Sequence, residues 1–251
     1  MIIHFTHRDT KYSADLSNGL DISIPLKSGA LGPKCFYAPD FKVEPVIAGD
    51  FIGSIEQGSP VNFKNILVNP HGNGTHTECA GHITAQPFTI NGCLKEFHFI
   101  ARLVTVVPDV AENGDKAITV RSLEQDHFRE IEAAVIRTVP NDTDKLVRDY
   151  SGTNPPYFNA ETIHWLNACG IKHIITDLPS IDREEDGGAL VGHRAFWGYP
   201  DFPDLGKTIT EMVYVPDSVE DGLYFCNIQI ASIESDASPS KVMLYNMLST
   251  D

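Results

Sequence analysis

Apolar residues along this 251-residue chain gather in short runs that are rich in β-branched side chains and are separated by glycine, proline and polar residues. Such runs, when turn-forming residues bound them, are typical of β-strands. The pattern predicts strands at residues 20–26, 65–68, 103–107, 133–139, 171–176, 209–215, 224–233 and 242–245. The chain is therefore expected to be rich in sheet.

One segment has the spacing of an amphipathic helix instead. Asn159 is placed to cap its first turn, and Ile163, Leu166 and Cys169 share one face. Gly170 stands where a left-handed helix terminator is expected. This helix leads directly into the predicted strand at residues 171–176.

A second, weaker helix is predicted at residues 120–132, with Leu123, His127 and Phe128 along one side. Strands come first, helix and strand then mix, and strands follow again. This order predicts an α/β fold with a mixed, largely antiparallel sheet and few helices. The length is that of a single domain, residues 1–251, with a substantial core.

Composition and charge narrow the range of partners. The chain has 19 basic and 34 acidic side chains, for a formal net charge of -15, which repels nucleic acids and anionic lipid surfaces. Its five cysteines form no CxxC pair, which favours a reducing compartment. The amino terminus lacks the pattern of a signal peptide and no apolar run is long enough to span a membrane. We expect a soluble, cytoplasmic protein without nucleic-acid or membrane partners.

The densest chemistry lies in His71-Gly-Asn-Gly-Thr-His-Thr-Glu-Cys-Ala-Gly-His82, with three imidazoles, a carboxylate and a thiol. Imidazole and carboxylate groups together suit zinc, manganese and similar divalent ions. If residues 75–79 are extended, His76 and Glu78 lie on one face, roughly 7 Å apart at the backbone. The neighbouring glycines allow turns that bring His71 and His82 towards the same point. The segment predicts a metal site.

The stretch Gly74-Thr-His-Thr-Glu-Cys-Ala-Gly-His82 resembles the motif GTHxDxPxH of the metal-dependent cyclase family, which includes bacterial kynurenine formamidases. Other segments resemble the family in the same order along the chain: Asp15-Leu-Ser17, residues 134–138, the helix at 159–170, residues 174–182, His193, Glu211 and residues 235–239. The resemblance covers nearly the whole chain. It implies the swivelling β/β/α fold of that family.

The resemblance also implies roles for individual residues. His76 and Glu78 correspond to metal ligands, with Glu78 at the position of a bridging aspartate. His193 and Glu211 correspond to ligands of a second ion, and His82 to an acid/base histidine. One or two divalent ions, zinc or manganese, are the implied cofactor.

Three positions depart from the family pattern. The family's first histidine falls at position 72, which is glycine here, so His71 is one residue too early. Glu78 is one methylene longer than the family's aspartate, and Ala80 replaces a proline. We expect His71 to be a metal ligand that an altered turn presents to the ion.

The sequence pattern supports Glu211 as a functional residue even without the family resemblance. Strand alternation over residues 209–215 places Glu211 on the same face as Ile209, Val213 and Val215. A carboxylate on an apolar face is costly unless it is paired or binds a metal. The alternative is an edge strand whose glutamate points to water. His193 lies in an ordinary loop sequence, where a surface histidine is the alternative.

A cysteine nucleophile is the competing chemistry, because Cys79 lies among His76, Glu78 and His82. On a strand, however, Cys79 points away from the face of His76 and Glu78. The chain contains no Gly-x-Ser-x-Gly, P-loop or Gly-x-Gly-x-x-Gly motif. Metal chemistry is therefore the better interpretation.

A divalent ion can activate water and polarise a carbonyl group, which suits hydrolysis of an amide-type C–N bond. The family resemblance implies an arylformamidase acting on N-formylkynurenine or a related aryl amide. Aromatic pairs in loop-like sequence, Phe36 with Tyr37 and Phe196 with Trp197, either line a pocket for an aryl ring or anchor loops to the core.

Two further functions stay open at this level. One is hydrolysis of a cyclic amide or lactone, as in isatin hydrolases of the same family. The other is a catalytically silent member that binds a metal or a small molecule, since the shifted His71 and the longer Glu78 alter the site. The resemblance also implies a homo-oligomer, either a dimer or a tetramer.

Overall fold

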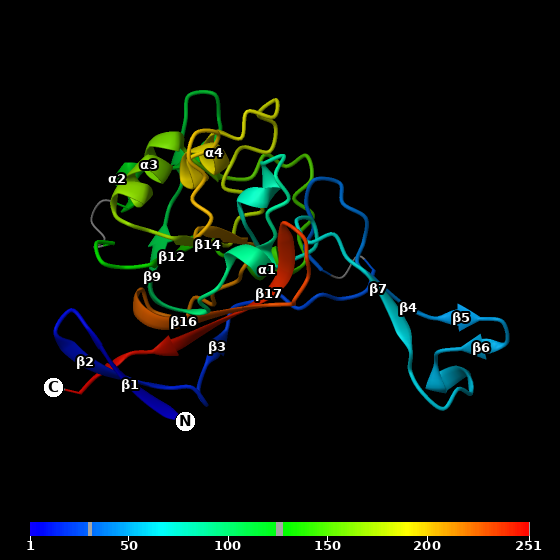
Figure 1. Cartoon of the computed structure of the whole chain (residues 1–251). Helices are drawn as coiled ribbons and strands as arrows, with labels where there is room; N and C mark the ends of the chain where they lie inside the picture. Colours follow the sequence, from blue (N-terminus) through cyan, green and yellow to red (C-terminus); the bar gives the residue numbers. More distant parts are fainter. Residues whose placement is uncertain (30–31, 124–127, 251) are drawn as a thin grey trace.

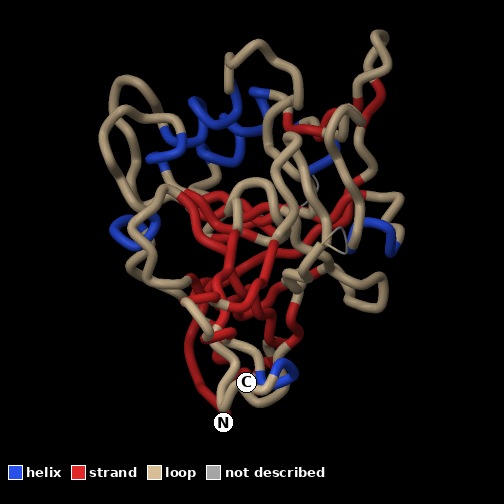
Figure 2. Tube along the Cα trace, turned by 90° about the vertical axis from the view of Figure 1, so that its right-hand side faces the viewer, coloured by secondary structure: helices blue, strands red, loops and turns tan. Residues whose placement is uncertain are grey.

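A computed structural model describes residues 1–29, 32–123 and 128–250. Within these residues the largest sheet has eight strands in the order β16-β9-β12-β14-β15-β8-β17-β3, and a further pairing of β16 with β17 closes seven of them into a ring. Their bounds are β3 (Leu20–Asp21), β8 (His76–Glu78), β9 (His98–Val106), β12 (Ala133–Thr138), β14 (His173–Thr176), β15 (Thr208–Glu211), β16 (Gly222–Ile230) and β17 (Ala237–Asn246). These strands lie at the centre of the molecule (Figure 2).

The sheet is mixed, as predicted. Strands β9, β12, β14 and β15 run parallel to one another, and the other pairings within the sheet are antiparallel. The central strands are buried on both faces, which explains the consecutive apolar residues 133–136 in β12 and 174–175 in β14. Ile136 and Ile174 belong to the core on one face, whereas Val135 and Ile175 belong to the core on the other.

Three helices, α2 (Val120–Leu123), α3 (Ala160–Ala168) and α4 (Val191–Trp197), cover one face of this sheet (Figure 1). The short helix α1 (Ile90–Cys93) lies apart from them, and its Ile90 belongs to the core on the other face. The predicted helix after Asn159 is confirmed as α3: the Asn159 side chain accepts a hydrogen bond from the Thr162 backbone N–H at 2.9 Å, and Gly170 has φ +89°. The predicted helix at 120–132 is confirmed only over α2, and His127 lies outside the described residues.

The predicted strands at 171–176 and 224–233 are shorter than expected, at His173–Thr176 and Gly222–Ile230, and two others are interrupted beside the candidate site. The strand at 209–215 ends at Glu211, because Met212 adopts φ +53° and the chain turns. The strand at 20–26 is regular only over β3, although Ser23 still bridges to Val213. Both interruptions lie beside β8, the strand that carries His76 and Glu78.

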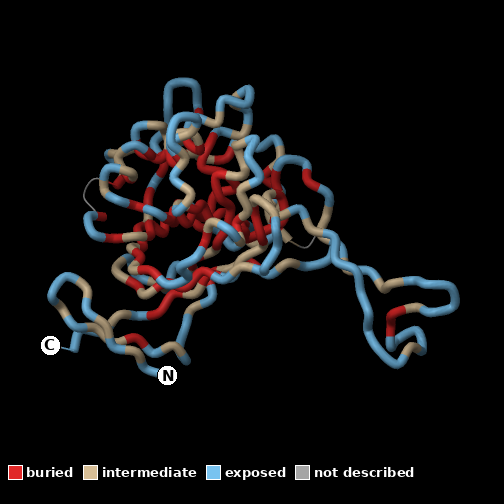
Figure 3. Tube along the Cα trace, in the orientation of Figure 1, coloured by how far each residue is buried: buried red, intermediate tan, exposed pale blue. Residues whose placement is uncertain are grey.

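Two smaller units project from this body, and they are mostly exposed (Figure 3). Near the termini, β1 (Ile2–His7), β2 (Thr10–Asp15) and β18 (Leu248–Ser249) form a three-stranded sheet. On the other side lies an arm, residues 42–67, that contains β4 (Lys42–Pro45), β5 (Ile47–Ala48), β6 (Phe51–Ile52), the 3-10 helix η1 (Ile55–Gln57) and β7 (Lys64–Leu67).

The remaining elements are short. Strands β10 (Asp109–Val110), β11 (Lys116–Ile118) and β13 (Tyr157–Phe158) form a small sheet, and the 3-10 helices are η2 (Ala80–His82) and η3 (Thr143–Leu146). No helix within the described residues combines the length and the apolar character needed to cross a membrane.

Candidate metal centre

Strand β8 supplies the centre of the candidate site. It lies between β15 and β17 in the closed sheet, and each of its residues is buried. As predicted, His76 and Glu78 alternate with Thr77, whose Oγ1 lies 2.8 Å from Thr210 Oγ1. The antiparallel register places Glu211 of β15 directly opposite His76. A fully buried strand thus carries an imidazole and a carboxylate side by side.

Glu78 is the point on which the predicted residues converge. Its Oε2 lies 2.9 Å from His71 Nδ1 and 4.0 Å from His82 Nε2, and its Oε1 lies 3.1 Å from His193 Nε2. Although burial opposes its ionisation, the charges and hydrogen bonds of these histidines hold the pKa of Glu78 well below its usual range. Residues more than 100 positions apart in sequence therefore meet at one carboxylate.

The shifted histidine reaches the cluster, and its position has a steric cause. A Cβ atom on Gly72 would lie 2.2 Å from the Cβ of Ala38 and 3.3 Å from the Cys35 carbonyl oxygen. Position 72 therefore has no room for a side chain of any kind. The chain instead presents His71, one residue earlier, to Glu78.

His76 shows that the cluster fits a cation. The Gly74 carbonyl oxygen lies 3.1 Å from His76 Nδ1 and can only accept, so Nδ1 carries the proton of the neutral ring. His76 Nε2 is buried without a hydrogen-bond partner and lies 3.3 Å from Glu211 Oε2. A nitrogen lone pair facing a carboxylate is unfavourable unless a positive charge lies between them.

The surroundings of His193 also require a positive charge between a ring nitrogen and a carboxylate. Its Nδ1 lies 2.6 Å from Asp182 Oδ2, while its Nε2 faces Glu78. Although burial opposes protonation, hydrogen bonds to Asp182 and Glu78 raise the pKa of His193 to about 10. Here a proton on His193 supplies the positive charge between the ring nitrogen and the Glu78 carboxylate. A metal ion would take the place of this proton, because a metal displaces protons from the groups that bind it.

The donor atoms form three groups within the described part of the chain, and in each group they lie within 4.8 Å of one another. The groups are His71 with His76 and Glu78, Glu78 with His82 and His193, and His71 with His82 and Asp236. Glu78 belongs to two of them. Imidazole nitrogen and carboxylate oxygen are the donors that zinc and manganese accept, so the residues could hold one ion or two that share Glu78.

Sequence reasoning assigned no role to Asp182. Its carboxylate accepts hydrogen bonds from the backbone N–H groups of Gly192 at 2.6 Å and His193 at 3.1 Å, besides contacting the His193 ring. Such a carboxylate fixes the orientation of a metal-binding histidine. The sequence nevertheless contains an indication of Asp182, because this residue ends the segment 174–182 that resembles the cyclase family.

Asp236 was also missed. Its Oδ2 lies 2.7 Å from His71 Nε2 and 3.4 Å from His82 Nδ1, and the hydrogen bonds to these rings hold its pKa far below the usual range. It enters the cluster from β17's amino-terminal side, beside Ala237, which pairs with Glu78. Asp236 thus orients two histidines at once.

The role of Asp182 gives a direct prediction. Asp182→Asn is expected to weaken metal binding by about 10–100-fold, because the amide no longer holds the His193 ring by a charged hydrogen bond. Titration of the metal-free protein with zinc measures this change. Asp186→Asn, which changes a carboxylate at the pocket lining without touching His193, is the matched control. Equal affinities for the two variants would contradict the assigned role.

The cluster opens into a pocket of about 360 Å³, which Phe36, Leu190 and Arg183 line together with His71, Glu78, His82, His193 and Glu211. The structure corrects the expectation for two aromatic residues: Phe196 and Trp197 lie in α4, are fully buried in the core and do not line this pocket. Tyr37 is 78% exposed beside Phe36. Of the four aromatic candidates, Phe36 lines the pocket.

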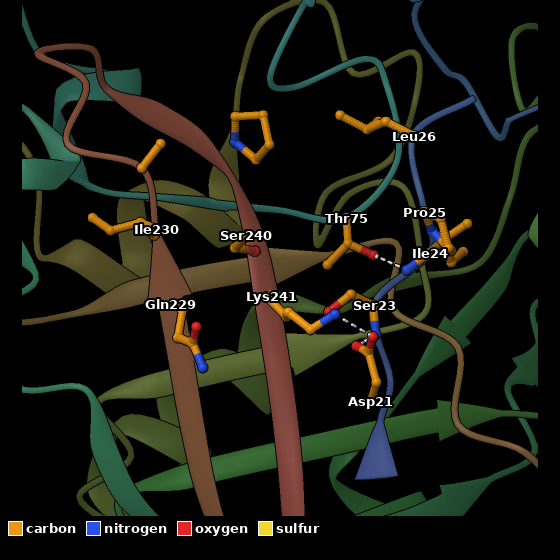
Figure 4. A pocket seen from close by; sticks show the side chains of 12 residues that line it. Asp21, Ser23, Ile24, Pro25, Leu26, Thr75, Gln229, Ile230, Ser240 and Lys241 are labelled. Carbon is orange, nitrogen blue, oxygen red and sulfur yellow. Dashed lines mark hydrogen bonds and ion pairs between the residues drawn. The ribbon is translucent and has the colours of Figure 1, made fainter. Parts of the chain in front are cut away.

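A larger hollow of about 420 Å³ lies elsewhere, against β3, β16 and β17 (Figure 4). Its charged groups and most of its hydroxyl groups are paired with each other or with the backbone, whereas the buried Oγ of Ser240 has no hydrogen-bond partner. Lys241 Nζ lies 2.7 Å from Asp21 Oδ2, and Thr75 Oγ1 accepts a hydrogen bond from the Ile24 N–H at 2.8 Å. The hollow contains none of the clustered histidines.

Cys79 does not behave as a nucleophile. It follows directly after β8, at the start of η2, and is fully buried among apolar residues. A hydrogen bond with Cys93 and burial raise the pKa of its thiol far above the usual range. The reactive thiolate form is therefore disfavoured.

A closed mixed sheet with a buried cluster of histidines and carboxylates defines the chain as a candidate metalloprotein. A family model described as "Putative cyclase" matches residues 15–183, most of the chain, and the chain belongs to this family. The matched region contains His71, His76, Glu78 and His82, whereas His193 and Glu211 lie beyond it.

Individual proteins are similar to the chain as well. A kynurenine formamidase of Bacillus cytotoxicus is 26% identical over 191 residues, covering 75% of this chain and 82% of that protein. A structure described as a potential metal-dependent hydrolase with cyclase activity has a TM-score of 0.66 at 17% identity, covering 91% of this chain and 97% of the other. Isatin hydrolase A from Labrenzia aggregata has a TM-score of 0.63 at 18% identity, covering 92% and 94%. The fold is shared with both structures.

Proposed function

We propose that this protein is a metal-dependent hydrolase of an amide-type C–N bond. The observation that carries the proposal is the buried Nε2 of His76, which faces the Glu211 carboxylate without a hydrogen bond, beside the carboxylate of Glu78. The names of the relatives agree with this chemistry, because kynurenine formamidase and isatin hydrolase both denote hydrolysis.

A divalent ion held by these side chains would supply a Lewis acid and lower the pKa of bound water. The protein's own contribution is positioning and proton transfer. His82 is 29% exposed and lines the pocket, so its ring can reach both the cluster and a substrate. Asp236 fixes this ring through Nδ1, which leaves Nε2 directed towards Glu78 and available to move a proton to the leaving nitrogen.

For the substrate we propose an aryl formamide such as N-formylkynurenine. A pocket of about 360 Å³ is the size of a small-molecule site, and Phe36 offers an aromatic surface at its lining. A cyclic amide such as isatin is the second candidate, because three isatin hydrolase structures share the fold.

Purified protein loaded separately with zinc and with manganese is expected to hydrolyse N-formylkynurenine, with isatin tested in parallel by the loss of its visible absorbance. Metal content per chain is measured on the same samples. Bound metal without hydrolysis of either substrate would indicate a silent, metal-binding member of the family. Failure to bind either metal would contradict the proposed function as a whole.

A further inference from the structure

Two cysteine thiols meet next to strand β8. Cys79 follows Glu78 at the end of the strand and is fully buried, and Cys93 is the last residue of α1. Both are free thiols that pack in the same apolar core, and a hydrogen bond joins them. Neither has a part in the proposed function. The fold thus places a pair of oxidisable sulfurs next to the central carboxylate of the candidate metal centre.

Contacts of the surrounding chain hold these two segments together. The Cys79 thiol lies 3.8 Å from the carbonyl oxygen of Phe88, the residue before Thr89, which caps α1. A Cβ atom on Gly81 would overlap the same oxygen. The turn after β8 therefore packs directly against the start of α1. This packing keeps the two sulfurs close, as the specific geometry of a disulfide requires.

Cys93 is the accessible member of the pair. It is half-buried and lines a hollow of about 320 Å³ together with Lys95, Lys172 and His173. The hydrogen bond with the Cys79 thiol lowers the pKa of Cys93, burial opposes this change, and the charge of Lys95 adds to it. The thiolate is the form of cysteine that reacts with an oxidant. A small oxidant that enters the hollow therefore meets a reactive sulfur at Cys93.

We propose that Cys79 and Cys93 form a reversible disulfide in the presence of a peroxide. The Cys93 thiolate attacks one oxygen of hydrogen peroxide, the O–O bond breaks, and Cys93 becomes a sulfenic acid. The hydroxide that leaves takes up the proton that the Cys93 thiol had released. The Cys79 thiol then condenses with the sulfenic acid: the S–S bond forms, the S–O bond breaks, and the Cys79 proton leaves with the hydroxyl group as water. Two thiols are oxidised to one disulfide, and one peroxide is reduced to two waters.

The disulfide would link the turn that contains His82 to α1, because Cys79 directly precedes η2. Disulfides in reducing compartments are usually transient, and exchange with a cellular thiol reopens them. The pair is therefore a reversible modification site beside the candidate metal centre. The proposal does not depend on the proposed function, because the disulfide forms without a metal or a substrate.

Peptide mapping of the full chain after treatment with hydrogen peroxide tests the proposal. Trypsin cuts after Lys64 and Lys95 and leaves residues 65–95 as one peptide, whose cysteines are Cys79 and Cys93. After unfolding and labelling with iodoacetamide, this peptide from untreated protein is expected to carry two labels. From peroxide-treated protein it is expected to carry none and to have lost two hydrogen atoms. Dithiothreitol is expected to restore both labels.

Another thiol of the same chain serves as the matched control. Cys169 is also half-buried, but it packs in the core on the other face of the sheet, and burial raises the pKa of its thiol. It is expected to keep its label under the same treatment. Peptide 65–95 that keeps both labels until Cys169 is oxidised would overturn the proposal. Oxygen gained at Cys93 while Cys79 stays labelled would also overturn it.

Two variants test the order of the steps. Cys79→Ala is expected to keep Cys93 as a sulfenic acid that dimedone labels, because the second thiol is missing. Cys93→Ser is expected to leave the buried Cys79 thiol unoxidised. Circular dichroism shows whether each variant is folded, and the test on the unmodified protein needs neither of them. Oxidation of Cys79 in folded Cys93→Ser protein would contradict the role of Cys93 as the first thiol to react.

Discussion

Glu78→Gln is expected to abolish stoichiometric metal binding and to lower turnover of any substrate by more than ~100-fold. This effect is larger than the one expected when a residue that only orients a metal ligand is replaced. The reason is its central position: Glu78 belongs to two of the groups of metal-ligand atoms and contacts His71 and His193 directly. A neutral amide at position 78 would supply no negative charge to balance a divalent ion held by these side chains. Metal analysis after gel filtration and steady-state rates with N-formylkynurenine measure the two effects.

The variant also separates metal loss from unfolding. Glutamine has nearly the shape of glutamate but removes the charge that pairs with His71 and His193, so the metal-free variant is expected to melt below the metal-free parent, and circular dichroism shows whether it is folded at the assay temperature. Glu112→Gln, an exposed site on a surface turn, is the matched control and is expected to keep full metal content. A Glu78→Gln protein with unchanged metal content would contradict the proposed centre.

His82→Gln is expected to reduce kcat by about 100- to 10,000-fold while metal content stays at the parent level, as general acid/base catalysis predicts. His82 differs from the other histidines of the cluster in its position. It is 29% exposed and its Nε2 lies 4.0 Å from Glu78, whereas His76 and His193 are buried. The arrangement suits a group that exchanges protons with a substrate more than one that only holds an ion.

Rates and metal content must therefore be measured together. The expected pattern is a loss in kcat, little change in KM and full metal occupancy. His164→Gln, at an exposed position of α3, is the matched control and should change none of the three. If His82→Gln loses metal together with activity, His82 is a ligand and the proton must move through another group.

Much of the sheet, and the part of the candidate site at residues 71–82, could be predicted from local sequence. Alternation along β8 and the apolar runs of β12 and β14 depend on nearest neighbours in the chain, and so does the cap of α3 by Asn159. The same holds for the density of histidines at residues 71–82. These features need no knowledge of distant contacts.

The parts that could not be predicted depend on long-range contacts. Asp236 meets His71 across 165 positions, and although residues 235–239 resemble the family, nothing in that segment indicates a contact with His71. Trp197 looks like a loop residue in sequence, but its indole N–H donates to the Lys207 carbonyl and the helix α4 packs it into the core. The apolar residues of the arm have strand-like spacing, and nothing in that spacing shows that they lie outside the core.

The contact between Gly72 and Ala38 limits which substitutions the site accepts. Since a Cβ atom at position 72 would overlap the Ala38 methyl group, a histidine cannot be accommodated there by one substitution alone. The loop around position 38 would have to give up its side chain or move at the same time. The two positions are therefore expected to change together among related sequences, and a search that requires histidine at a fixed spacing will pass over every relative that carries this alternative turn.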